Sequence, residues 1–355
     1  MQLTWLLYLK TLPGWEYNLD MLYKECKKAM CYVCTTGSKK CAASGSKPSQ
    51  NINHANMNIA AAELWLSNKL ADIYEPSEAI QMASMVMEKI TGLYGGNRAF
   101  QRAKELNAEQ EQQLKAYFIR LEQHEPVQYV LGEAWFYDFP LYVDGNVLIP
   151  RPETEELVEW VLKDVQASGK PVFQKTPTDA DRTNLLKVLD VGTGSGCIAL
   201  ALKRKMPLAE VWGCDVSDGA LNVARRNGSD LDIRVDFVGL DFLDEAQWRQ
   251  LPTVDILVSN PPYIPLTEKD SMAAHVVNHE PHKALFVPDQ DPLIFYKALA
   301  NFGHHRLYPQ GSIYLEIHEN LGAAVCRLLD VAGYTTELRK DLQGRDRMIR
   351  ASKKL

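Results

Sequence analysis

The stretch that most constrains this chain is a short apolar run that ends at the tetrapeptide Asn260-Pro261-Pro262-Tyr263. The run, Val254–Ser259, has the length and the β-branched content of a fully buried parallel strand. In open α/β sheets, ligands lie beyond the carboxyl ends of such strands. The sequence therefore predicts an α/β fold in which Asn260 stands at a functional site.

The two prolines give the tetrapeptide a specific use. Each proline disfavours the α region for the residue before it, so the backbone of Asn260 and Pro261 stays extended. The side-chain oxygen of Asn260 and the main-chain oxygen of Pro261 can then accept both hydrogens of a planar NH2 group, and Tyr263 supplies a flat wall. We interpret the tetrapeptide as a clamp for a conjugated amino group. By itself, the Pro-Pro pair would favour a rigid loop. A second site upstream favours the clamp instead.

That second site is a glycine-rich turn between a predicted strand and a predicted helix. The strand, Leu185–Val191, runs into Gly192-Thr193-Gly194-Ser195-Gly196, and an apolar helix follows. The three glycines permit a tight turn that brings backbone N–H groups close to a ligand, beside the positive end of the helix. Such a glycine pattern is a weak signal by itself, so its context matters.

Two further strand ends supply that context. The stretch Ala209–Cys214 ends at Asp215, an acid suited to binding ribose hydroxyls. The stretch Ile233–Leu240 ends at Asp241-Phe242, where a carboxylate can meet an adenine amino group and a ring can stack on the base. Three successive strand ends therefore predict a nucleoside-binding row, and the strand that leads to Asn260 comes fourth.

With these motifs the chain resembles the class I S-adenosylmethionine-dependent methyltransferases. It resembles most specifically the HemK/PrmC family, which methylates the side-chain amide of the glutamine in the Gly-Gly-Gln loop of peptide release factors. The resemblance covers about residues 60–352 and includes segments beyond the Asn-Pro-Pro-Tyr motif, which adenine methyltransferases share. These segments are Pro126–Gly132, Ile149–Glu155 and the Glu280-Pro281 pair that precedes Ala284-Leu285.

The resemblance implies a fold, a cofactor and a set of site residues. The fold is α/β, a Rossmann-like class I methyltransferase sheet with a small N-terminal helical domain and a linking β-hairpin. The cofactor is S-adenosyl-L-methionine, and the residues expected to contact it are Gly192, Thr193, Gly194, Ser195, Gly196, Asp215, Asp241, Phe242 and Asn260. The residues expected to hold the substrate glutamine and to carry the catalysis are Asn260, Pro261, Pro262 and Tyr263, with Arg151 and Glu153 bordering the entrance.

Charge narrows the choice of partner. The chain has 355 residues, enough for two domains, and a net charge of −6 at pH 7 with a pI near 5.8. Proteins that bind phosphate backbones usually carry a basic excess, so direct binding of nucleic acid is not expected. No uncharged apolar run reaches the roughly eighteen residues that a membrane span needs. We expect a monomeric enzyme whose partner is a release factor.

The first 58 residues differ in composition from the rest of the chain. After an apolar start they are rich in lysine, serine and asparagine, which is typical of a leader and a disordered linker. We predict a mitochondrial presequence here, in a mitochondrial-type member of the family; otherwise the protein would be cytoplasmic. The presequence is imperfect, since it lacks arginine and carries Glu16, Asp20 and Glu25.

The sequence predicts no metal centre. Four cysteines of the leader lie close enough together to suggest zinc, but no histidine or second paired knuckle supports such a site. These are Cys26, Cys31, Cys34 and Cys41. Three histidines beyond the clamp are spaced irregularly, and we interpret them as residues of a flap or of the solvent-facing surface. These are His275, His279 and His282.

Three segments follow the leader. Residues 59–125 carry amphipathic helices at 60–66, 76–90 and 107–123, which predict a substrate-engaging bundle, and Ser77 is the expected start signal of the second. Residues 126–150 predict a β-hairpin linker with Asp144-Gly145 as its turn. Residues 151–355 form the predicted methyltransferase domain. It begins with a helix whose first-turn acids, Glu153 and Glu155, equally suit the helix dipole.

The rest of that domain is expected to complete the sheet. A loop is predicted at 166–184 and a flap over the pocket at 272–285. The predicted helices are at 291–307 and 321–332, with a strand at 312–317 between them. The last two strands, at 334–339 and 347–351, predict an antiparallel pair with a turn at 344–346.

The resemblance implies a protein-(glutamine-N5) methyltransferase that supports translation termination. The sulfonium methyl group is already activated, so the residues chiefly align the amide nitrogen, and no strong base is required. One alternative is an adenine amino-group methyltransferase acting on DNA or RNA, which would use the same clamp on a flipped base; the acidic balance disfavours it. Another alternative is a non-catalytic adaptor, against which the intact glycines, Asp215 and the clamp argue.

Overall fold

The computed structural model describes residues 57–170 and 185–354. Apart from Met57 and Asn58, the predicted leader and its four cysteines lie outside the described residues, as does most of the predicted loop at 166–184. The described residues belong to the unit Asn56–Leu355.

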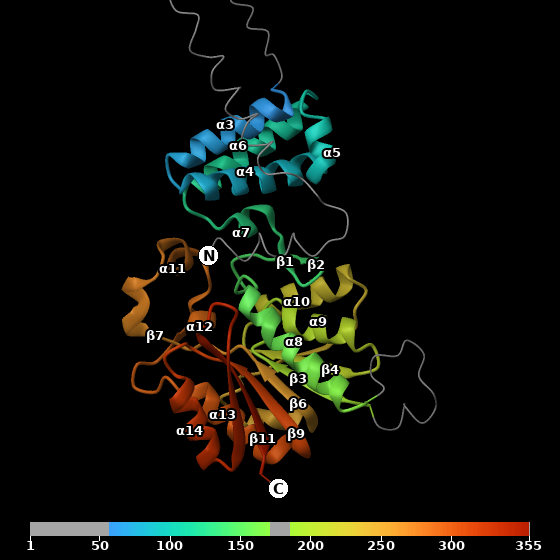
Figure 1. The fold of residues 1–355 in the computed structure, drawn as a ribbon, viewed down its shortest axis with the longest axis vertical. Coiled ribbons are helices and arrows are strands. Elements are labelled where there is room, and N and C mark those ends of the chain that lie inside the picture. Colours follow the sequence, from blue (N-terminus) through green and yellow to red (C-terminus); the bar gives the residue numbers. More distant parts are fainter. Residues whose placement is uncertain (1–56, 171–184, 355) are drawn as a thin grey trace, which may run out of the picture. The chain divides into compact units, whose positions relative to one another are not determined.

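A bundle of helices occupies residues 59–122 (Figure 1). Polar caps explain where two of the helices begin: the Asn58 side chain accepts a hydrogen bond from the N–H of Ala61, and Asn107 forms a capping box with Gln110. The three predicted helices are confirmed, and their apolar faces share one core. The helices are α3 (Ile59–Ala71), α4 (Pro76–Thr91), α5 (Gly95–Phe100) and α6 (Ala108–Glu122).

The predicted start of the second helix at Pro76 is confirmed, because proline suits the first helical turn; Ser77 therefore lies inside that turn instead of capping it. One detail of the bundle differs from expectation. Helix α5 was not predicted, since it begins with two glycines. Tertiary contacts hold it in place: Arg98 donates to the carbonyl oxygen of Ser84 and pairs with Glu63 at 3.2 Å.

A short helix and a hairpin follow, but the hairpin turns earlier than predicted. Helix α7 (Val127–Leu131) leads to strands β1 (Ala134–Phe136) and β2 (Phe139–Leu141), which pair in antiparallel fashion. The turn lies at Tyr137-Asp138, so the prediction of Asp144-Gly145 was wrong. The reason is tertiary. The Tyr137 N–H donates to Glu155 Oε1 at 2.7 Å while Tyr137 takes a left-handed conformation with φ of 56°.

Within the described residues, one sheet of seven strands forms the centre of the fold, in the order β10-β11-β9-β6-β3-β4-β5. The predicted strands are confirmed, and so is the antiparallel final pair, β10 with β11. Strand β5 begins three residues later than predicted. The strands are β3 (Lys187–Val191), β4 (Glu210–Asp215), β5 (Asp236–Gly239), β6 (Val254–Ser259), β9 (Leu307–Glu316), β10 (Tyr334–Lys340) and β11 (Asp346–Lys353).

Helices cover both faces of this sheet (Figure 1). Successive side chains of a strand point to opposite faces of the sheet, so a strand that is apolar throughout makes both faces apolar. Val188 packs into the cluster on the α8 and α9 side, while its neighbour Leu189 packs into the cluster on the α13 side. The helices are α8 (Pro152–Ala167), α9 (Cys197–Lys205), α10 (Asp218–Asp230), α13 (Ile294–Arg306) and α14 (Gly322–Val331).

The segment predicted as a flap consists of short elements. Two strands, β7 (Ile264–Pro265) and β8 (Phe286–Val287), pair in parallel and close its base. Between them lie η5 (Leu266–Ser271), α11 (Ala274–His279) and α12 (His282–Leu285). A further short helix, η4 (Glu245–Gln250), joins β5 to β6.

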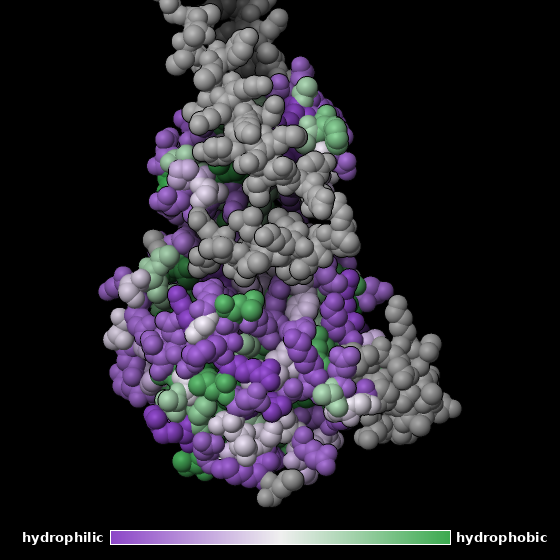
Figure 2. Space-filling view, viewed as in Figure 1, coloured by the Kyte–Doolittle hydropathy of each residue, from purple (hydrophilic) through white to green (hydrophobic). Residues whose placement is uncertain are grey.

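The surface of the sheet-bearing part is mostly hydrophilic on the face seen in Figure 2, where hydrophobic residues form small separate spots. No helix in the described ranges, 57–170 and 185–354, is long and apolar enough to cross a bilayer.

The parallel strands bring the predicted site residues to one edge of the sheet. Val191 of β3 lies beside Cys214 of β4 and Ser259 of β6, so the chain leaves all three strands at the same level. The glycine turn, Asp215 and Asn260 therefore start from adjacent strand ends, as expected for an open α/β sheet.

Candidate active site

The glycine turn presents an open backbone surface. Gly192 and Gly194 have φ values of 71° and 53°, and a Cβ atom added at either would meet no atom within 4 Å. Gly196, with φ of 80°, serves packing instead, since its Cβ would lie 3.1–3.2 Å from Leu200 and Ala224. The first two glycines thus leave room for a ligand, while the third lets helix α9 begin close to its neighbours.

A buried carboxylate supports this turn from beneath. Asp190 is fully buried on β3 and accepts a hydrogen bond from Thr193 Oγ1 at 2.7 Å. Burial raises the pKa of Asp190 to about 7, because the interior disfavours the charged form. The sequence interpretation did not include Asp190 in the site.

Asp215 braces the same turn from the side. Its Oδ2 accepts a hydrogen bond from the Gly194 N–H and its Oδ1 accepts one from the Ser217 N–H, both at 2.9 Å. Burial raises the pKa of this carboxyl above its ordinary value. A carboxylate has about four acceptor sites, so the binding of ribose hydroxyls expected for Asp215 remains available.

Asp241 and Phe242, the two residues predicted to contact adenine, differ in their exposure to solvent. Asp241 is exposed, and its Oδ1 accepts a hydrogen bond from the Leu243 N–H at 2.9 Å. The Phe242 ring is only 6% exposed and packs 5.6 Å from Trp248 and 5.3 Å from Phe302. Phe242 is therefore mostly a core residue, and its stacking on a base stays a prediction.

The side chain of Asn260 is held by a chain of hydrogen bonds. Its Nδ2 donates to Thr154 Oγ1 at 3.2 Å, and Thr154 Oγ1 donates to Glu316 Oε2 at 2.7 Å. Because the threonine hydroxyl has one proton and gives it to the carboxylate, it meets the asparagine with a lone pair. The Oδ1 atom of Asn260 is thereby left as an acceptor for a ligand.

The same carboxylate holds the other end of the tetrapeptide. The Tyr263 hydroxyl donates to Glu316 Oε1 at 3.2 Å, and its ring lies edge-on to His318 at 5.9 Å. Pro261 is buried and Pro262 half-buried between these two anchors. Glu316 is itself 2% exposed, and burial raises its pKa to about 7.

Arg151 and Glu153, predicted at the entrance, point to different neighbours. Arg151 Nη2 lies 2.5 Å from Oε1 of Glu280, which belongs to the flap segment and has a side chain only 1% exposed. Glu153 lies in the first turn of α8 and accepts a hydrogen bond from Gln343 Nε2 at 3.1 Å. The structure thus joins Arg151 to the flap and leaves Glu153 in the position that suits the helix dipole.

The three histidines lie in or beside the flap, in agreement with that interpretation. His279 Nε2 is 3.3 Å from the carbonyl oxygen of Gln123, and His282 Nε2 is 2.8 Å from that of Val277. His275 is exposed on α11.

Besides Asp190, three functional candidates escaped the sequence interpretation: Thr154, Glu280 and Glu316. Thr154 and Glu280 lie inside segments quoted for the family resemblance, but no role was derived for them. Glu316 carried a usable signal, since it is an acid in the apolar stretch Ser312–Ile317 at a strand end. A charged residue in a buried strand needs a partner, so this pattern alone marks a candidate.

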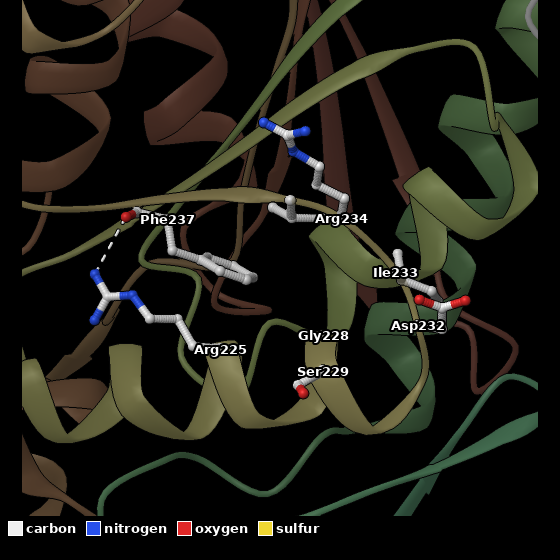
Figure 3. A pocket seen from close by; sticks show the side chains of 8 residues that line it. Arg225, Gly228, Ser229, Asp232, Ile233, Arg234 and Phe237 are labelled. Atoms are coloured by element: carbon white, nitrogen blue, oxygen red, sulfur yellow. Dashed lines mark hydrogen bonds between the residues drawn. The ribbon is translucent and has the colours of Figure 1, made fainter.

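A separate pocket of about 310 Å³ lies away from these residues, beside the start of β5. Figure 3 shows Arg225 and Arg234 extending beside the ring of Phe237, with Arg225 bonded to the Phe237 carbonyl oxygen at 3.2 Å. The start of a strand is the edge opposite to the one that carries the glycine turn, so this pocket is distinct from the candidate active site.

The sheet with its reversed last strand, together with the glycine turn and the Asn-Pro-Pro-Tyr segment, defines a domain of the class I methyltransferase type. Family models agree: residues 62–132 match the PrmC N-terminal domain and residues 175–286 match the methyltransferase small domain. The chain belongs to the family of release factor glutamine methyltransferases.

Sequence relatives carry that assignment. The chain is 36% identical over 284 residues to a release factor glutamine methyltransferase of Flavobacterium psychrophilum, covering 80% of this chain and 95% of the relative. It is 37% identical over 290 residues to one of Bacteroides thetaiotaomicron, covering 81% and 98%. A crystal structure of a release factor-specific protein-(glutamine-N5) methyltransferase from Alicyclobacillus acidocaldarius is 26% identical, with a TM-score of 0.34, and covers 61% of this chain and 100% of that one.

Proposed function

We propose that this protein transfers a methyl group from S-adenosylmethionine to the side-chain amide nitrogen of a glutamine in a peptide release factor. The observation that carries the proposal is the fixed Asn260 amide, whose Oδ1 stays free as an acceptor because its Nδ2 is bound to Thr154 at 3.2 Å. Family membership supports the same substrate, since relatives named for it align over nearly their whole length.

The glycine turn fits the nucleoside part of such a cofactor. Open space above Gly192 and Gly194, next to the N-terminus of α9, suits close approach of a ligand to the backbone. Asp215 offers carboxylate lone pairs for ribose hydroxyls, and Asp241 offers an exposed carboxylate for an adenine amino group. When bound, S-adenosylmethionine supplies an activated methyl group on a sulfonium centre.

The tetrapeptide aligns the acceptor. Asn260 Oδ1 and the main-chain oxygen of Pro261 would accept the two N–H groups of the substrate amide, which turns the nitrogen toward the methyl group. Both oxygens would also stabilise the positive charge that grows on the nitrogen during transfer. The proton that the nitrogen must then lose can pass to water, so the residues need supply no strong base.

The alternative substrate is an adenine amino group, which the same clamp could hold. The net charge of −6 argues against it, because a nucleic acid backbone is normally met by a basic surface. The helical bundle further supports a protein substrate, since remote contacts can orient a folded partner but not a free glutamine.

The test is mass spectrometry of an intact release factor incubated with the full chain and labelled cofactor. We expect one methyl group on the glutamine of the Gly-Gly-Gln loop, and little transfer to free glutamine or to an adenine-containing duplex. Comparable transfer to the duplex would overturn the proposal in favour of the nucleic acid enzyme.

Location is a separate part of the proposal. A mitochondrial location rests on the composition of residues 1–58 alone. A fusion of residues 1–58 to a fluorescent reporter tests the location, and diffuse cytosolic signal would contradict it.

A further inference from the structure

The clamp depends on residues far from it in sequence. Asn260 follows β6, Thr154 lies in the first turn of α8, and Glu316 ends β9. Thr154 and Glu316 are each only 2% exposed, so the hydrogen bond between them is shielded from water, while the bond from Asn260 to Thr154 is partly buried. Water cannot replace a missing partner of the buried bond, so its direction constrains the group that Thr154 presents to Asn260.

In its ionised form, the Glu316 carboxylate sets that direction. That form can only accept, so the hydroxyl protons of both Thr154 and Tyr263 point toward it, at 2.7 Å and 3.2 Å. Thr154 then has only lone pairs to offer Asn260, which must present its NH2 group. If Asn260 turned its amide over, two acceptors would face each other, and the oxygen needed by a substrate would be lost from the pocket.

We propose that Thr154 and Glu316 are positioning residues for the reaction, which hold the Asn260 amide in the one orientation that can accept an N–H group of the substrate. This inference rests on the proposed function of Asn260–Tyr263 as an amide clamp. Neither residue touches the reacting atoms in this account, and each acts through the tetrapeptide.

The central experiment replaces Thr154 by valine in the full chain. Valine keeps the shape of threonine but removes the hydroxyl, so Asn260 loses its anchor. We expect kcat for methylation of an intact release factor to fall roughly tenfold or more, because an acceptor that can rotate is misaligned part of the time. The affinity for S-adenosylmethionine, measured by calorimetry, should stay within about threefold, since the glycine turn is untouched. Thr154→Ser restores the hydroxyl and should restore most of the rate.

A double-mutant cycle separates positioning from a general structural role. If Thr154 acts through Asn260, adding Thr154→Val to Asn260→Ala should cause almost no further loss of kcat. A further loss as large as that in the wild-type background would overturn the proposal. So would a wild-type rate for Thr154→Val, or failure of Thr154→Ser to rescue the rate.

A spectroscopic measurement keeps the inference apart from the choice of substrate. In protein labelled with 15N at asparagine only, Asn260→Ala identifies the side-chain NH2 signals of Asn260. Those signals should exchange slowly with water in the wild type and in Thr154→Ser, and rapidly in Thr154→Val. This holds whether or not the release factor is methylated, so failure of the assay alone would count against the proposed function only. Equal exchange in all three proteins would overturn the positioning role.

Folding of the variants is checked by thermal unfolding. If Thr154→Val does not fold, Glu316→Leu carries the same tests, because leucine has no atom that can accept the proton of Thr154. Loss of folding in both variants would show that the pair serves the fold, and the positioning role would be rejected.

Discussion

Two halves of the candidate site are each supported by a buried carboxylate that holds a threonine hydroxyl. In the cofactor half, Asp190 accepts from Thr193 at 2.7 Å; in the substrate half, Glu316 accepts from Thr154, also at 2.7 Å. Burial raises the pKa of both carboxyls to about 7. The two pairs differ in sequence distance, which is 3 residues in the first and 162 in the second.

That difference separates two ways of building a site. In the cofactor half, the Asp190–Thr193 pair comes from one strand and the turn that follows it, so this pair forms together with the turn; Asp215 and Asp241 join it from the ends of the next two strands. The substrate half needs α8, β6 and β9 in their final places, because each contributes one member of the Thr154, Asn260 and Glu316 chain. Damage to the first half should therefore weaken cofactor binding, whereas damage to the second should lower the rate at saturating cofactor.

Asn260→Ala is expected to give the largest effect and to act on the substrate half alone. Loss of one positioned acceptor should lower kcat on the order of a hundredfold, roughly 3 kcal/mol of transition-state stabilisation. Cofactor affinity should change little, because the glycine turn and Asp215 remain. Steady-state kinetics with an intact release factor and calorimetry with the cofactor measure the two effects.

The matched control for that variant is Asn301→Ala, which removes an amide on α13 that is bonded to Glu245 at the surface. Its kcat should equal that of the wild type. Near-normal turnover of Asn260→Ala at saturating cofactor and release factor would mean that the amide clamp has to be abandoned.

The same difference explains what the sequence could predict. The glycine turn, its strand and the tetrapeptide are contiguous motifs, and the structure places them at adjacent strand ends as expected. Thr154 lies 106 residues from Asn260, and Tyr263 lies 53 residues from Glu316. No local pattern reports such pairings, so the residues that orient the clamp were missed.

Tertiary contacts add what local signals do not contain. Phe242 stands at a strand end, which suggested stacking on a base; its ring also packs against Trp248 and Phe302, and the contact with a base stays a prediction. Asp144-Gly145 has the composition of a hairpin turn, yet the chain turns at Tyr137, whose N–H is bonded to Glu155. In both cases the contacting partner comes from another element of the fold.

The second prediction tests whether the two carboxylates are equivalent. A carboxyl whose pKa is raised on folding binds its proton more tightly in the folded state, so its stabilising contribution is present at low pH and is lost as pH rises through about 7. Between about pH 5.5 and about pH 8, each carboxyl should cost about 2 kcal/mol in the free energy of unfolding. Glu316→Gln and Asp190→Asn should therefore each lose about 2 kcal/mol less of the free energy of unfolding than the wild type does between these two pH values. Urea unfolding at both pH values measures the difference.

Charged neighbours set how closely Glu316 follows that expectation. The ionisable groups that interact with it electrostatically are Arg347 on β11, Glu153 on α8, Tyr263 after β6, Tyr296 on α13 and Cys197 on α9. The Arg347 charge opposes the effect of burial, and Glu153 adds to it. If Glu316→Gln left the pH dependence of wild-type stability unchanged while Asp190→Asn reduced it, the two halves would differ in electrostatics as well as in assembly.

Asp215→Ala is expected to give the smallest effect. It tests the cofactor half of the site. A ribose contact is made about equally in the ground and transition states, so its loss should raise the cofactor dissociation constant about tenfold, or about 1.4 kcal/mol, with little change in kcat. Asp215→Asn keeps an oxygen that can accept from the Gly194 N–H and should retain more affinity. Asp230→Ala is the matched control, since that side chain is 60% exposed at the far end of α10. A fall in kcat at saturating cofactor without loss of affinity would contradict the division of labour between the two halves.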